Sequence, residues 1–133
     1  MYISRNFSVE ELTKTSTGIE NEPNTEQLQN LTELVNNILQ PIRNLICQPI
    51  EVTSGFRSPE VNKKVGGVKN SQHLKGQAAD LRCANNKELF SIIKDVLKDY
   101  DQLIWEYGTK EQPAWVHVSW VGKNNRKQII YNY

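Results

Sequence analysis

The stretch SQHLKGQAADLR, residues 71–82, leads from a polar loop into a predicted strand and contains one of the chain's two histidines. His73 precedes Asp80 by seven residues, with a glycine and two alanines between them. The other histidine, His117, lies in WVHVSW (115–120), where the alternating pattern predicts a second strand. In that strand Trp115, His117 and Ser119 share one face, because successive strand side chains point to opposite sides.

Three further strands are predicted from runs of β-branched and aromatic residues, at 50–54 (IEVTS), 102–107 (QLIWEY) and 127–133 (KQIIYNY). A short helix is predicted within FSVEELTKT (7–15), where Ser8 and Glu11 can form a capping box. Another is predicted at 58–65, where Ser58 precedes Pro59 and the glycines at 66 and 67 follow.

A long helix is predicted from Thr25, which can cap it, and Pro41 should kink the helix or end its first part. Its apolar stripe is spaced by three and four residues: Leu28, Leu31, Val35, Ile38, Ile42 and Leu45. A last helix, 87–100, is capped by Asn85 or Asn86, and its stripe is Leu89, Ile93, Val96 and Tyr100.

Helices therefore come first along the chain and strands cluster late. This order favours the α+β class, with helices packed on a mostly antiparallel sheet. At 133 residues, with 38% hydrophobic and 23% charged side chains, we expect residues 1–133 to form one domain.

The overall charge and hydropathy exclude several classes of protein. A formal net charge of +1 argues against nucleic-acid binding, and no stretch approaches the roughly 20 apolar residues of a membrane span. The first residues, MYISRNFSVEEL, lack the apolar region of a secretory signal peptide. We expect a monomer in which Cys47 and Cys83 are two buried, reduced thiols, although a disulfide stays open as an alternative.

His73, Asp80 and His117 are candidate metal ligands, because zinc is bound by imidazole nitrogen, thiolate and carboxylate oxygen. Catalytic zinc sites use three protein ligands and leave a fourth position open. The small residues between His73 and Asp80 let the backbone pass close to an ion. The alternative, a packed or exposed histidine without metal, stays open at this stage.

Three segments of the chain resemble the motifs of the zinc D-Ala-D-Ala carboxypeptidase family. SGFRS (54–58) resembles the family's arginine motif, SQHLKGQAAD (71–80) its SxHxxGxAxD motif, and VHVS (116–119) the late strand that supplies a ligand. The resemblance runs from about residue 7 to the C-terminus. It implies a hedgehog/DD-peptidase fold and a zinc peptidase acting on the peptidoglycan stem peptide, as a D-Ala-D-Ala carboxypeptidase or an L-Ala-D-Glu endopeptidase.

The resemblance also implies roles for single residues. His73, Asp80 and His117 would bind one Zn2+ per chain, and Arg57 would bind substrate through its paired guanidinium donors. Ser71 matches a motif position and is a candidate for hydrogen bonding to substrate or to a ligand.

Two neighbouring residues are further candidates for contacts with substrate. Gln72 could donate to substrate or be an ordinary loop residue. Trp115 could form a wall of the cleft or pack in the core.

One expected catalytic residue is missing. Much of the family carries the general base three residues before the last histidine ligand, where this chain has Ala114. Two acids could replace it: Glu106, at the end of a strand expected beside that of His117, and Glu111, in the preceding loop. We therefore predict a zinc peptidase with Glu106 as the base, against a non-catalytic zinc-containing binding module and a fold relative without metal.

The biological setting follows from the resemblance alone. A compact domain without a signal peptide is expected to be made in the cytoplasm and to act at the bacterial cell wall, as phage or prophage endolysins do.

Overall fold

The computed structural model describes all 133 residues. Its helices are α1 (Val9–Thr13), α2 (Thr25–Leu34), α3 (Gln40–Ile46), α4 (Pro59–Lys64) and α5 (Asn86–Ile92). Its strands are β1 (Glu51–Ser54), β2 (Ala78–Arg82), β3 (Gln102–Glu106), β4 (Trp115–Ser119) and β5 (Gln128–Asn132). A 3-10 turn, Gln72–Lys75, interrupts the predicted loop before β2.

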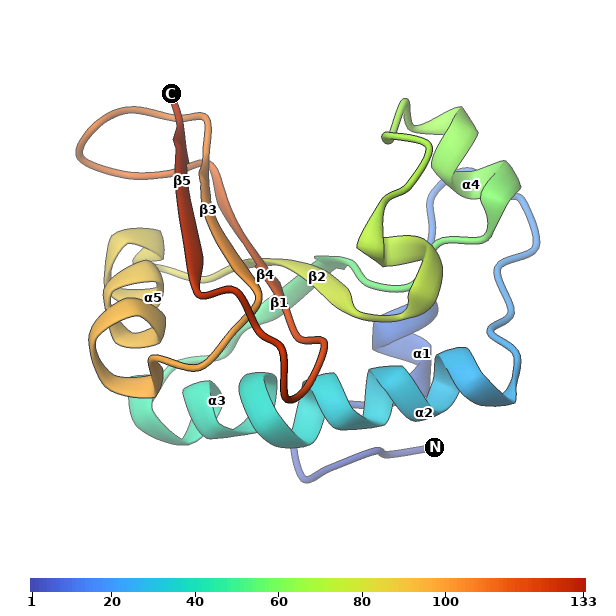
Figure 1. Cartoon of the computed structure of the whole chain (residues 1–133), viewed down its shortest axis with the longest axis horizontal. Helices are drawn as coiled ribbons and strands as arrows, with labels where there is room; N and C mark the ends of the chain where they lie inside the picture. The colour runs from blue at the N-terminus through green and yellow to red at the C-terminus, as the bar shows by residue number, and fades with distance from the viewer.

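The five strands form one sheet in the order β1-β2-β4-β3-β5 (Figure 1). All neighbours are antiparallel except β3 and β5, which are parallel. The predicted class, α+β with helices on a mostly antiparallel sheet, is confirmed. No helix has the length and apolar character needed to cross a membrane.

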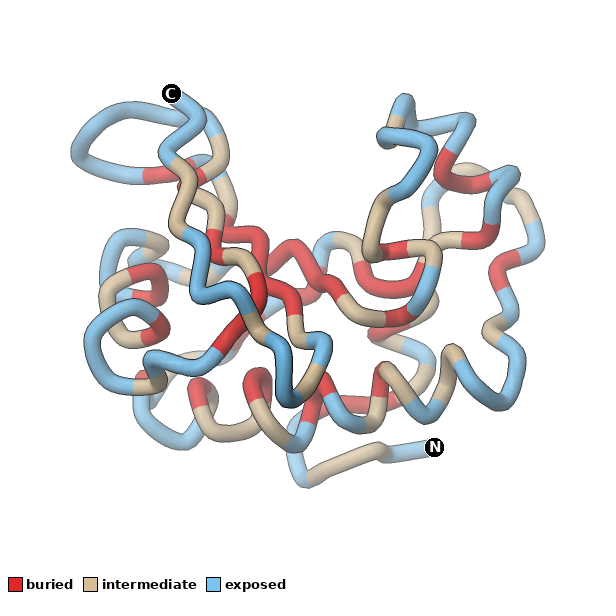
Figure 2. Tube along the Cα trace, in the orientation of Figure 1, coloured by how far each residue is buried: buried red, intermediate tan, exposed pale blue.

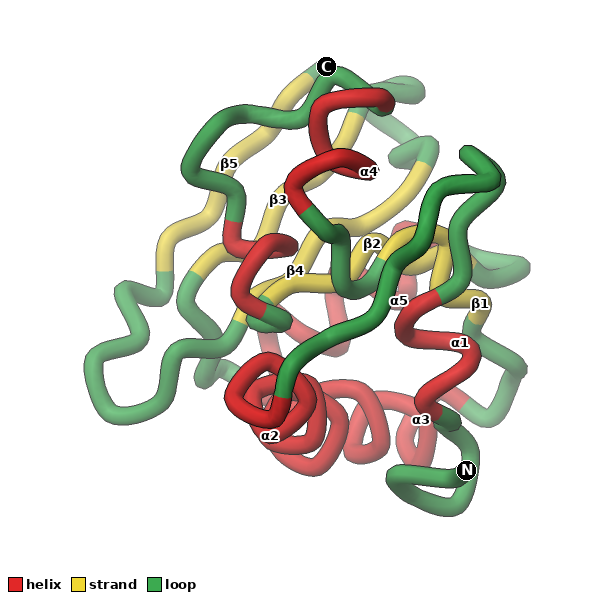
Figure 3. The backbone as a smooth tube through the Cα atoms, turned by 90° about the vertical axis from the view of Figure 1, so that its right-hand side faces the viewer, coloured by secondary structure: helices red, strands yellow, loops and turns green.

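Helices α1, α2, α3 and α5 pack against one face of the sheet, and the opposite face carries the polar residues of interest. α2 and α3 run below the strands, whereas α4 lies above them (Figure 3). The core joins side chains from α1, α2, α3 and α5 to the lower face of the sheet, and buried positions concentrate at this junction (Figure 2). Strand residues on the lower face are Val52, Ala79, Leu81, Leu103, Trp105, Val116 and Val118.

Two π-helical turns shift the apolar stripes of the long helices. The turn Val35–Leu39 lies between α2 and α3, and it contains one residue more per turn than an α-helix, so the buried face advances along the sequence. Ile46 is therefore buried, whereas the predicted Leu45 is 49% exposed. A second π-helical turn, Ile93–Leu97, follows α5 and leaves Val96 exposed in the same way.

The residues predicted to cap the helices were correct in α1 and α5 but not in α2. Ser8 and Glu11 form the predicted capping box, and Asn85 caps α5. The cap of α2 is Asn24 rather than Thr25, because the Asn24 side chain accepts from the backbone N–H of Gln27.

The cysteines are free, as predicted, but they are not both buried. Cys47 is exposed and Cys83 is half-buried. Cys47 lies at the end of α3 in a left-handed conformation, outside the core.

Candidate metal centre

Strand register brings two of the three predicted ligands together. Asp80 of β2 lies directly opposite His117 of β4 in the antiparallel ladder. Opposed residues in such a pair project from the same face of the sheet. His117 Nδ1 lies 2.9 Å from Asp80 Oδ1, and both residues are buried. Two positions separated by 37 residues therefore share one site on the sheet face opposite α2 and α3.

The third predicted ligand, His73, reaches this point from the 3-10 turn before β2. Its Nδ1 lies 2.7 Å from the backbone carbonyl oxygen of Gly55. A carbonyl oxygen can only accept, so Nδ1 carries the proton and donates to it. The other ring nitrogen, Nε2, is then free to act as a ligand, and it lies 3.5 Å from Asp80 Oδ1.

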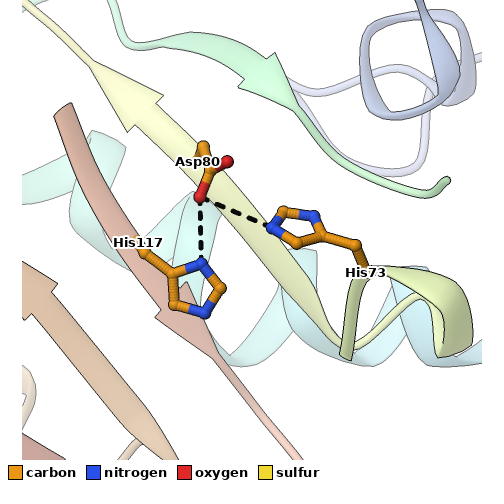
Figure 4. Close-up of side chains that lie close together, drawn as sticks. All are labelled: His73, Asp80 and His117. Atoms are coloured by element: carbon orange, nitrogen blue, oxygen red, sulfur yellow. Dashed lines mark hydrogen bonds and ion pairs between the residues drawn. The ribbon is translucent and has the colours of Figure 1, made fainter. Parts of the chain in front are cut away.

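The three side chains converge from separate elements on one point (Figure 4). Each offers one donor atom, and these atoms lie within 4.8 Å of one another. Tetrahedral zinc, with ligand bonds of about 2.0–2.2 Å, places neighbouring ligand atoms about 3.4 Å apart. The separations of 2.9 Å and 3.5 Å from Asp80 Oδ1 fit that spacing with small adjustments. The cluster can therefore hold one metal ion, with two imidazoles and one carboxylate.

The environment of Asp80 favours its ionised form. Burial alone would raise the pKa of this carboxyl group, but the hydrogen bond from His117 and the adjacent His73 ring outweigh that effect and hold the pKa well below its ordinary value. Arg57 adds a further positive charge, since its Nη2 lies 3.3 Å from Asp80 Oδ2. One oxygen of Asp80 thus faces the histidines and the other faces a guanidinium group.

Arg57 is fixed by contacts on three sides. Its Nε donates to Ser54 Oγ at 2.9 Å, and its Nη1 donates to Asn62 Oδ1 at 3.2 Å. Burial lowers the pKa of Arg57, while the charge of Asp80 opposes that change. The arginine therefore both supports a candidate ligand and presents a preorganised cation beside the cluster. Asn62 was not singled out in the sequence, because a polar residue inside a short helix gives no distinctive pattern.

A cleft of about 730 Å³ opens over the cluster. Its lining includes Arg57, the three candidate ligands, Glu106 and Trp115. Glu106 and Trp115 lie opposite each other on β3 and β4, on the same face as His117. Glu111 lies in the exposed loop before β4 and does not line the cleft. The structure therefore brings Glu106 to the cleft of the cluster and leaves Glu111 outside it.

Ser71, Gln72 and Trp115 also line the cleft, and each has a partner within the chain. Ser71 Oγ accepts from the backbone N–H of His73, so it supports the turn that carries this residue. Trp115 is half-buried and packs against Tyr107, with ring centroids 5.3 Å apart. The roles of Ser71, Gln72 and Trp115 in binding substrate stay predictions.

Asp101, a buried carboxylate that the sequence analysis missed, bonds to residues of two separate segments. Asp101 is 2% exposed, accepts from Gln72 Nε2 at 2.8 Å, and forms a two-point pair with Arg126 through Nε at 3.0 Å and Nη2 at 2.7 Å. The hydrogen bonds from Arg126 outweigh burial and lower the pKa of Asp101 to about 2. Asp101 thus joins the turn beside His73 to the segment before β5. A single acid between a helix and a strand carries no signal of this role.

Comparisons with known proteins agree with this geometry. A sequence model of the family described as Peptidase M15 matches residues 5–119. The zinc D-Ala-D-Ala carboxypeptidase of Streptomyces albus G is 56% identical over 34 residues, which make up 26% of this chain and 13% of that protein. The second similarity is therefore local, and the chain matches only a small part of that relative. Both findings confirm the resemblance noted in the sequence.

Proposed function

The chain belongs to the peptidase M15 family, and from this premise we propose that it is a zinc-dependent peptidase that hydrolyses a bond in the peptidoglycan stem peptide. One observation carries the proposal: the buried His73, Asp80 and His117 converge beneath a cleft that also contains Arg57 and Glu106. A purely structural metal site has four protein ligands and is closed, whereas this cluster has three and faces a cleft.

His73, Asp80 and His117 would hold one zinc ion. When bound, zinc in such a site supplies a Lewis acid for the scissile carbonyl and lowers the pKa of a bound water to about 7. The Gly55 carbonyl fixes the tautomer of His73, and Arg57 holds the second oxygen of Asp80. Such outer partners orient the ligands and support metal affinity.

Arg57 and Glu106 would carry the remaining chemistry. The guanidinium group of Arg57 suits the carbonyl or carboxylate groups of the substrate, because it offers several donors and a permanent charge. Glu106 would take a proton from the attacking water and return it to the leaving amine, in place of the acid missing at Ala114. Ser71, Gln72 and Trp115 would contact the stem peptide along the cleft.

The absence of an acid at Ala114 favours a second candidate, a zinc-containing binding module of the same fold without catalysis. In that case Glu106 would be an ordinary polar residue of the cleft.

For the location we propose synthesis in the cytoplasm and action at the bacterial cell wall, with release of the phage or prophage type. This proposal rests on the family resemblance alone.

The deciding experiment measures zinc per chain and, on the same sample, digests purified peptidoglycan and identifies the fragments by mass spectrometry. We expect one zinc per chain and one new stem-peptide cleavage, whose position distinguishes a carboxypeptidase from an endopeptidase. His73→Ala should lose both zinc and hydrolysis. Bound zinc without cleavage across several wall types would refute the peptidase and support the binding module.

Two glutamate variants test the identity of the base. Glu106→Gln should keep its zinc and lose about 10²–10⁴-fold in kcat, the usual contribution of general acid–base catalysis. Glu111→Gln should leave kcat unchanged, because Glu111 does not line the cleft. The opposite pattern would move the role of base from Glu106 to Glu111.

A further inference from the structure

The C-terminal strand builds part of the cleft wall although it lies beyond residues 5–119, which the family model matches. β5 runs parallel to β3, so that Asn132 comes into register with Glu106. The backbone N–H of Tyr107 also donates to the carbonyl oxygen of Asn132 at 2.8 Å, which fixes this end of β5 against β3. Asn132 and Glu106 both line the cleft.

The side chains of these two residues are in direct contact. Asn132 Nδ2 donates to Glu106 Oε1 at 3.1 Å. An ionised carboxylate only accepts, so the Asn132 amide must present its nitrogen to Glu106. The other oxygen, Oε2, makes no hydrogen bond within the chain. The contact therefore holds one oxygen of Glu106 and leaves the second available to the cleft.

We infer that Asn132 is a positioning residue that orients the Glu106 carboxylate for proton transfer. This inference rests on the proposed role of Glu106 as the base. A glutamate side chain has several rotatable bonds, and proton transfer needs its oxygen within about 2.6–3.2 Å of the proton donor. A displacement of about 1 Å can cost about 10²-fold in rate. A donor fixed on the neighbouring strand restricts the carboxylate to fewer orientations.

Steady-state kinetics on the cleaved stem peptide test this inference. Asn132→Ala should lower kcat about tenfold with KM unchanged, because it alters the orientation of the base and removes no substrate contact. Asn132→Asp should lower kcat further, since a second carboxylate repels that of Glu106. The matched control is Gln128→Ala, on the same face of β5, whose side chain contacts Gln102 instead. It should keep wild-type kcat.

Non-additivity separates positioning from a general structural effect. If Asn132 acts through Glu106, adding Asn132→Ala to Glu106→Gln should cause no further loss of kcat. A full tenfold loss in that background would overturn the inference. Zinc content should stay at one per chain in every variant.

A spectroscopic measurement tests the contact without relying on activity. In the 15N–1H spectrum of the folded protein, the Asn132 side-chain amide should show one proton shifted downfield by the carboxylate, and Glu106→Gln should reduce that shift. An unchanged resonance would overturn the inference. Wild-type kcat in Asn132→Ala, with Glu106→Gln inactive, would overturn it while leaving the proposed function intact. Wild-type kcat in Glu106→Gln would instead refute the role of Glu106 itself.

Discussion

Gly55 lies where the first helix, the arginine motif and a candidate zinc ligand meet. A Cβ atom added at this position would lie 2.3 Å from the carbonyl oxygen of Leu12 and 2.9 Å from its carbonyl carbon. Both are backbone atoms, so no flexible side chain can move aside. The same Leu12 oxygen accepts from the N–H of Phe56 at 2.8 Å, and the carbonyl of Gly55 accepts from His73. Gly55→Ala should therefore disturb the fold and the metal centre together.

The expected losses of stability and zinc affinity in Gly55→Ala follow from these contacts. Relieving the clash needs a displacement of about 1 Å, and forced overpacking costs about 1–3 kcal/mol. Weakening the hydrogen bond between Leu12 and Phe56 adds about 1 kcal/mol. We expect a loss of about 2–4 kcal/mol in the free energy of unfolding, or roughly 10 °C in Tm for a chain of this length. Displacing the acceptor of His73 should also weaken zinc binding about 10–100-fold.

Urea unfolding of the zinc-free protein gives the first quantity, and competition with a chromophoric chelator gives the second. Gly18→Ala is the matched control, because no atom lies within 4 Å of its added Cβ and only its positive φ of 75° opposes the change. That control should cost about 1–2 kcal/mol and leave zinc affinity unchanged. If Gly55→Ala is within 0.5 kcal/mol of wild type and binds zinc normally, the argument from close approach is wrong.

Three further predictions concern Asp101, Arg57 and the two cysteines. The pKa of Asp101 is about 2, below its ordinary 3.8, so its stabilising effect is present above pH 4 and is lost as the pH falls towards 2. Asp101→Asn should therefore lower Tm at pH 7, and this difference should shrink in melts at pH 3; an equal difference at both pH values contradicts the assignment. Arg57→Lys should keep one zinc per chain but lose about 10–100-fold in kcat/KM, because an ammonium group cannot reproduce the contacts with Ser54, Asn62 and Asp80; unchanged kinetics would exclude a role for the guanidinium group. Iodoacetamide should modify the exposed Cys47 faster than Cys83, because burial raises the pKa of the Cys83 thiol, and peptide mapping would reveal the reverse order.

The sequence predicted the elements well where the signal is local. The period of two in β4 placed His117, Trp115 and Ser119 on one face. In the structure Trp115 and His117 line the cleft, and Ser119 is fully buried. The errors in the apolar stripes fall where the helical period was interrupted. Leu45 and Val96 left the predicted stripes because π-helical turns changed the phase of the helices, and such turns leave no pattern in a sequence.

The candidate site also has features that the sequence predicted and features that depend on the fold. His73 and Asp80 lie seven residues apart, so a loop entering a strand can bring them together. The position of His117 within a strand made it the third candidate ligand, and the motif resemblance added the role of Arg57. No local pattern contains the pairing of Asp80 with His117, because it depends on which strands become neighbours and in which register. Register follows from burying the apolar faces of all strands against the helices at once.

The sequence by itself therefore determined the periodicities, the caps, the candidate ligands and the family motifs, which all depend on residues close together in the chain. Only the tertiary structure decided the partners that surround them. It placed Asp101 between Gln72 and Arg126, and Asn132 beside Glu106, through contacts that span more than 20 residues. The physical reason is that such contacts form only when the sheet and its helices pack together, so their geometry is a property of the whole fold.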